Sequence, residues 1–213
     1  MKKTLLFLLL FTGSHLYAQP SLNAVKLGLF NPSAMEQGFI IGYEGGRAFD
    51  RNFDIGWSID WFHKNYVDRG LEQQFNAIYG IPGGTINELR AKTNVHSFPV
   101  MVTATGRFPF GNRSAVFVTG GIGAEALLIF YRNFQNTGES EFTGAFDFNW
   151  RIGAGVVFGT GSNTEVFGEL TYHHSNPSWE YEVDDSRYGI KRVFERTFDM
   201  SGMMMRVGFR FYH

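Results

Sequence analysis

Between positions 146 and 158 every second residue is apolar, and the positions between them are mostly polar or glycine. Such alternation is typical of a β-strand with two different faces. Strands of soluble proteins usually span about five or six residues, whereas a tilted strand needs roughly 9 to 11 residues to cross a bilayer. The pattern therefore predicts a membrane-spanning strand that turns its apolar face to lipid. Asp147 and Arg151, on the other face, fit the polar interior of a transmembrane β-barrel.

The same alternation recurs along the chain and predicts eight strands. They cover residues 23–30, 38–46, 52–61, 98–108, 115–131, 146–158, 165–174 and 198–211. Glycines are frequent on the faces that point inward, and they make room in an eight-stranded barrel, whose interior is only wide enough for side chains.

The connections between these strands alternate in length. Residues 47–51, 109–114 and 159–163 form short turns, whereas 63–95, 132–143 and 175–197 are long and polar, and 31–37 is a short exception among the latter. Outer-membrane barrels have short periplasmic turns and longer extracellular loops. The sequence therefore predicts an all-β protein, an eight-stranded antiparallel up-and-down transmembrane β-barrel with both termini on the periplasmic side.

Composition narrows the possible functions. The chain contains no cysteine, so disulfides, thiol chemistry and cysteine-based metal sites are excluded. Its formal net charge of −1 provides no basic surface for nucleic acid. We expect no cofactor and no metal site. The expected partners are outer-membrane lipid and lipopolysaccharide, with a possible extracellular ligand at the long loops.

The first residues have the order of a secretory signal peptide. Lys2 and Lys3 precede a short apolar run, and small or polar residues follow it up to Ala18. The run is too short for a membrane-spanning helix. We expect residues 1–18 to be a signal peptide and residues 19–213 to form one outer-membrane barrel domain.

Eleven charged residues fall on the inward faces of the predicted strands: Lys26, Glu44, Asp54, Asp60, Arg107, Glu125, Asp147, Arg151, Glu169, Arg206 and Arg210. Unpaired charges are costly when they are partly buried, so we expect them to pair across the lumen and fill it. The alternative is a polar pathway that conducts ions.

The whole mature chain resembles the small OmpA/OmpX-like outer-membrane barrels. Its last strand ends in alternating aromatic residues over positions 207–213, similar to the C-terminal signal by which such barrels are recognised for insertion. The resemblance implies a Gram-negative outer-membrane protein.

One segment has the residue types of a nucleophilic site. His173 and Ser175 lie two residues apart near the end of the seventh predicted strand, so both point to the same side. A hydroxyl beside an imidazole can act as a nucleophile with its general base when an acid orients the imidazole. The acid stays unassigned, since several carboxylates are near in sequence: Glu180, Glu182, Asp184, Asp185, Glu195 and Asp199.

The His-x-Ser-Asn sequence at positions 173–176 resembles the lipid A deacylase (PagL) family, together with glycine-rich strand sequence from about residue 117 onward. The resemblance implies a serine esterase with Ser175 as nucleophile and His173 as base. In the family the acid follows the histidine by about fourteen residues, where this chain has Arg187, and the site faces lipid. Here the outward register of Leu170 and Tyr172 turns His173 inward.

Three functions follow from these observations. The first is a structural or surface-interaction barrel that acts through its long loops, and in that case His173 and Ser175 only end a strand near the lipid headgroups. The second is a lipid A acyl-ester hydrolase, which would make the protein an enzyme. The third is a narrow pore. We favour the first.

Overall fold

The computed structural model describes residues 20–50, 52–67, 92–132, 140–185 and 190–213. The predicted signal peptide lies outside the described residues, as do the tips of the three long loops. Ten strands are described: β1 (Ser21–Pro32), β2 (Gly38–Ala48), β3 (Phe53–Val67), β4 (Lys92–Pro109), β5 (Ser114–Arg132), β6 (Ser140–Gly159), β7 (Thr164–His174), β8 (Ser178–Asp185), β9 (Ile190–Thr197) and β10 (Gly202–Tyr212).

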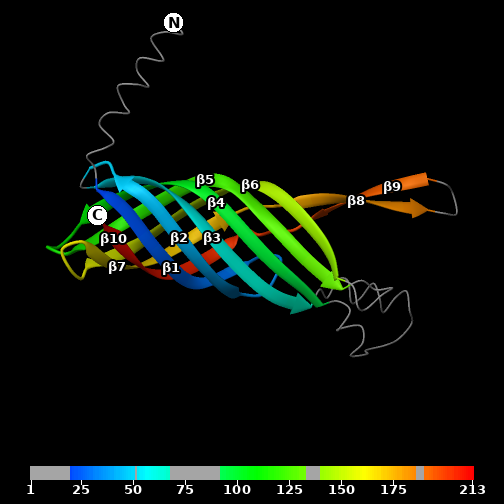
Figure 1. Cartoon of the computed structure of the whole chain (residues 1–213), viewed down its shortest axis with the longest axis horizontal. Helices are drawn as coiled ribbons and strands as arrows, with labels where there is room; N and C mark the ends of the chain where they lie inside the picture. The colour runs from blue at the N-terminus through cyan, green and yellow to red at the C-terminus, as the bar shows by residue number, and fades with distance from the viewer. Residues whose placement is uncertain (1–19, 51, 68–91, 133–139, 186–189) are drawn as a thin grey trace, which may run out of the picture.

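Eight of these strands close into a barrel in which every neighbouring pair is antiparallel. The hydrogen-bonded order is β5-β4-β3-β2-β1-β10-β7-β6, and pairing of β5 with β6 closes the sheet. Figure 1 shows the tilted strands and both ends of the described chain on one side of the barrel. We call this side the turn end, because the short turns lie there, and the opposite side the loop end. The predicted eight-stranded barrel is confirmed.

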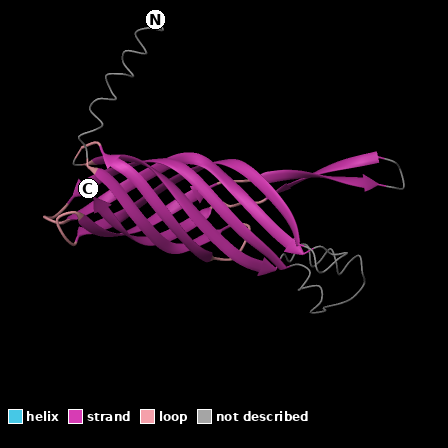
Figure 2. Cartoon of the chain, in the orientation of Figure 1, coloured by secondary structure: helices cyan, strands magenta, loops and turns pink. Residues whose placement is uncertain are grey.

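The outer wall of the barrel is apolar. Large hydrophobic side chains are exposed at alternate positions along its strands, for example Val102, Ile122, Phe148 and Val207. A soluble protein rarely exposes a continuous apolar surface of this size. The belt therefore faces lipid, as the alternation in the sequence predicts. Strands make up almost all of the described structure (Figure 2). Among the described residues no helix is long and apolar enough to span a bilayer.

The strands on one side of the barrel are longer than predicted. β3 continues to Val67 and β4 starts at Lys92, so their ladder extends beyond the apolar belt. β4 also runs through Pro99. The ladder between β3 and β4 lacks pairs only near this residue, because proline has no N–H to donate.

The connection from β7 to β10 is not an open loop. β8 and β9 pair along their whole length and form a two-stranded ribbon that projects from the loop end (Figure 1). The last barrel strand also begins later than predicted, at Gly202 in place of Phe198. The amide of Ser201 donates to the Asp199 side chain at 2.9 Å, and this local bond replaces regular strand pairing there.

Candidate functional site

Asp60 of β3 lies in the middle of the lumen and has two guanidinium partners. Its Oδ2 lies 2.7 Å from Nη1 of Arg151, and its Oδ1 accepts a hydrogen bond of 3.0 Å from Nη1 of Arg206. All three side chains are buried. Alternation turns each of them inward, and the two partners of Asp60 come from β6 and β10, neither of which is a neighbour of β3 in the barrel.

The same network continues toward β1, β2 and β7. Nη2 of Arg206 lies 2.7 Å from Oε1 of Glu169, and Nζ of Lys26 lies 3.4 Å from the same oxygen. Lys26 also lies 2.5 Å from Glu44. These residues, together with Asp60 and Arg151, contain three cations and three carboxylates, so the centre of the lumen is neutral when all are ionised. The predicted pairing across the lumen is confirmed.

A second ionic layer closes the lumen at the turn end. Arg107 donates to Asp54 at 2.9 Å and to Glu165 at 3.2 Å, while the Tyr212 hydroxyl donates to Glu165 at 2.9 Å. Arg210 lies between the two layers, with its guanidinium 4.9 Å from the centre of the Phe167 ring. Charged groups thus span the lumen from its middle to its turn end.

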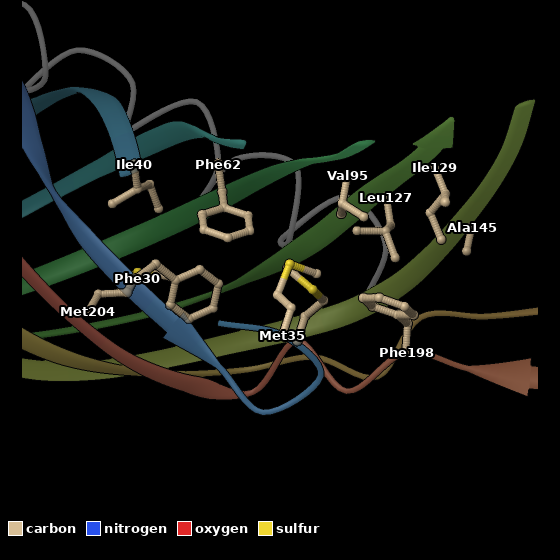
Figure 3. Close-up of a cluster of buried hydrophobic side chains, with 11 residues drawn as sticks. Phe30, Met35, Ile40, Phe62, Val95, Leu127, Ile129, Ala145, Phe198 and Met204 are labelled. Atoms are coloured by element: carbon tan, nitrogen blue, oxygen red, sulfur yellow. The ribbon is translucent and has the colours of Figure 1, made fainter. Parts of the chain in front are cut away.

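At the loop end the interior becomes apolar (Figure 3). A cluster of eleven buried hydrophobic residues fills this part of the barrel: Phe30, Met35, Ile40, Phe62, Val95, Leu127, Ile129, Ala145, Phe198, Met200 and Met204. Most come from barrel strands, but Met35 belongs to the connection from β1 to β2, and Phe198 and Met200 to the segment before β10. We call this cluster the apolar plug, because connecting segments contribute side chains that cover the lumen.

His173 and Ser175 point inward, as their register predicts, and both lie next to residues of the apolar plug. Both are 0% exposed. His173 Nε2 forms a hydrogen bond of 2.7 Å with Oε2 of Glu125, and Oε1 of Glu125 accepts one of 2.6 Å from Ser97. The ring of Phe30 meets the imidazole edge-on, with centroids 5.7 Å apart.

The structure therefore brings a histidine together with a carboxylate, but not with the serine. Ser175 Oγ and His173 Nδ1 are both buried without a hydrogen-bond partner among the described residues. A serine nucleophile needs a hydrogen bond to its base, and here neither atom makes one. The catalytic assignment of His173 and Ser175 stays a prediction.

The sequence did not identify Glu125 as a partner of His173. Alternation turns Glu125 inward, but it lies on β5, two strands away from β7 in the barrel. The two side chains meet because β5 and β7 are shifted along the barrel axis so that Glu125 and His173 lie at the same level. The acids that are near in sequence instead lie along the ribbon or close to it, and Arg187 lies outside the described residues.

The residues after His173 anchor the ribbon to the barrel. His174 Nδ1 lies 2.8 Å from the Ser201 hydroxyl, and the amide of Asn176 donates to Asp147 at 2.6 Å. The amide of Met200 donates to the carbonyl of Ser175 at 2.9 Å. The chain thus continues from β7 toward β8 without a free loop between them.

In the described part of the chain no group of three or more His, Cys, Asp or Glu side chains is arranged to hold a metal ion. A cavity at the turn end has a volume of about 280 Å³ and is lined by two of the short turns together with Arg107, Glu165 and Tyr212. These three side chains already bind one another.

Comparison with known proteins supports the fold alone. No protein-family model matches the chain, and no curated protein sequence matches it. The structure is similar to a major outer membrane protein from Thermus thermophilus, with a TM-score of 0.61 and 11% identity over 92% of this chain and 100% of the other. It is also similar to Neisserial surface protein A, with a TM-score of 0.55 and 8% identity over 90% and 95% of the two chains. The chain therefore has the fold of the small eight-stranded β-barrels that reside in the bacterial outer membrane.

Proposed function

We propose that this protein is a structural and surface-interaction barrel that acts through its loop end, with the turn end facing the periplasm. The projecting β8–β9 ribbon is the observation that carries the proposal (Figure 1). Paired charges and the apolar plug fill the lumen of the barrel below it. Recognition then falls to the ribbon and the loops around it.

The backbone of the ribbon is suited to binding another chain. β8 and β9 pair with each other at eight positions, but among the described residues β8 pairs with the barrel wall at one position, Ser178 with Phe146. Unpaired strand edges can accept a further strand from a partner. The ribbon sequence is rich in charge of both signs, so an extracellular protein ligand is the partner that we favour.

Site-specific photo-crosslinking on intact cells tests this proposal. A photoreactive amino acid at Val183, in β8, should capture an extracellular partner, whereas the same residue at Gly161, in a short turn, should not. Replacing the ribbon with a short glycine-serine turn should abolish capture without unfolding the barrel, which heat-dependent gel mobility reports. Equal capture from both positions, or none from Val183 in the organism's natural setting, would refute the proposal.

The lipid A esterase remains the second hypothesis, and the Glu125–His173 hydrogen bond is the feature that speaks for it. Burial speaks against it, because an acyl ester in the membrane cannot reach a hydroxyl with 0% exposure. Mass spectrometry of lipid A decides between the two hypotheses. We expect the same acyl pattern in cells with the wild-type protein and with Ser175→Ala, and loss of one acyl chain only in the wild type would establish the esterase.

A further inference from the structure

The lipid-facing wall has a hollow that opens into the apolar belt. It has a volume of about 290 Å³ and lies across β1 to β4, where its walls are Val25, Ile41, Tyr43, Ile59, Trp61 and Phe98. These side chains are apolar or aromatic, and most are exposed on the outer face of the barrel. We call this hollow the outer groove.

The position of the groove has a cause in the sequence. The ladder between β3 and β4 runs up to the pair Ile59–Val100 and resumes at Phe62–Ser97, so Asp60 and Trp61 are unpaired on this side. Continuing the register places Pro99 opposite Asp60. Proline lacks the N–H that would close the ladder, and the interruption coincides with the part of the groove that Trp61 and Phe98 line.

Two histidines follow at the end of the groove that is nearer the loop end. His63 and His96 are opposite each other on β3 and β4, and their ring centroids are 4.5 Å apart. The ring of Trp61, a wall of the groove, lies 6.1 Å from each of them. The imidazoles therefore lie beyond the apolar walls, toward the membrane surface.

Hydrogen bonding leaves these imidazoles with capacity for a ligand. Trp61 Nε1 donates to His96 Nδ1 at 3.2 Å, so a neutral His96 has its proton on Nε2 and can donate from there. His63 Nδ1 is buried and has no hydrogen-bond partner among the described residues. Because this atom is closed to solvent, a ligand meets the half-buried rings of His63 and His96 at their other atoms.

We propose that this surface binds a phosphorylated, acylated glycolipid of the outer leaflet, with an acyl chain in the outer groove and a phosphate at His63 and His96. The groove is continuous with the belt that faces lipid, so its occupant is an acyl chain. Phosphate oxygens accept hydrogen bonds from imidazole N–H groups, and these bonds are charge-assisted because the phosphate is an anion. The choice of leaflet rests on the proposed orientation of the barrel.

The experiment measures binding of purified, bis-phosphorylated lipid A to the folded barrel in detergent by native mass spectrometry. His63→Ala combined with His96→Ala should weaken binding by at least about tenfold, which corresponds to about 1.4 kcal/mol, because both imidazole donors to the phosphate are lost. Dephosphorylated lipid A should bind the wild type and the double variant equally. Heat-dependent gel mobility confirms that each variant is folded.

A second variant tests the groove separately. Val25→Phe fills it with a ring and should weaken binding of both forms of lipid A, whereas Val207→Phe, on the outer face of β10, should not. The proposal is overturned if the double histidine variant binds phosphorylated lipid A as tightly as the wild type. It is also overturned if phosphatidylglycerol binds as tightly as lipid A, because the site would then not select the outer-leaflet glycolipid. Photo-crosslinking from Val183 is independent of these results, so failure here is distinguishable from failure of the proposed surface function.

Discussion

Removal of Arg206 should destabilise the barrel more than removal of any rim charge, because this guanidinium joins two carboxylates in the middle of the lumen. Arg206 is 2% exposed and lies 3.0 Å from Asp60 and 2.7 Å from Glu169. In Arg206→Met both carboxylates lose a partner, and the central network changes from neutral to one net negative charge. Breaking a buried ion pair on one side costs about 3 to 5 kcal/mol. Asp60 keeps Arg151, so we expect about 3 kcal/mol, the lower end of that range.

Lys64→Met provides the matched control. Nζ of Lys64 lies 3.8 Å from a carboxylate oxygen of Glu36, whose side chain is 79% exposed. Exposed pairs contribute about 0 to 1 kcal/mol. The assay is reversible urea unfolding in lipid vesicles, followed by tryptophan fluorescence and gel mobility. Equal free energies of unfolding for the two variants would refute the structural role of the lumen network.

Three further predictions concern packing, the buried histidine and conduction. Gly208→Ala should lower the free energy of unfolding by about 1 to 3 kcal/mol, because its Cβ would lie 2.6 Å from the carbonyl oxygen of Val25. Gly168→Ala has open space around the new Cβ and should not lower it. Urea unfolding of the two variants compares them. Glu125→Ala should cost about 1 to 3 kcal/mol in the same assay, since it leaves buried His173 without its partner, and no measurable loss would contradict the assigned hydrogen bond. In planar bilayers the wild-type barrel should show no stepwise conductance, and regular open-channel steps would show that the apolar plug does not seal the lumen.

The barrel could be predicted from the sequence because lipid imposes a strict alternation on every spanning strand. The strand from Phe146 to Phe158 illustrates this: each apolar residue must face outward, so Arg151 must face the lumen. The same constraint predicts that His173 points inward, and the side chain is buried there.

The β8–β9 ribbon could not be predicted in this way. It stands outside the barrel wall, so neither lipid nor a core dictates the polarity of its residues, and its strongly charged sequence is typical of a loop. The hydrogen bond between Glu125 and His173 was also not predictable. It depends on the positions of two residues along the barrel axis, in strands that are not neighbours. The alternation shows only whether a side chain points inward or outward, and not where it lies along that axis.

The outer groove lies between these cases. Proline has no N–H to donate to a ladder, yet the strand continues on both sides of Pro99. The hollow arises because the register is kept while the ladder is interrupted. The alternation of apolar residues therefore predicts neither the groove nor its ligand.

We expect the barrel to span the outer membrane with the β8–β9 ribbon outside the cell and the short turns in the periplasm. Because the chain contains no cysteine, single cysteines can be introduced and labelled without background. Intact cells with Val183→Cys or Gly161→Cys would be treated with a membrane-impermeant maleimide, before and after the outer membrane is permeabilised. We predict labelling of Val183→Cys in intact cells and of Gly161→Cys only after permeabilisation. Labelling of Gly161→Cys in intact cells, with Val183→Cys protected, would show that the barrel has the opposite orientation.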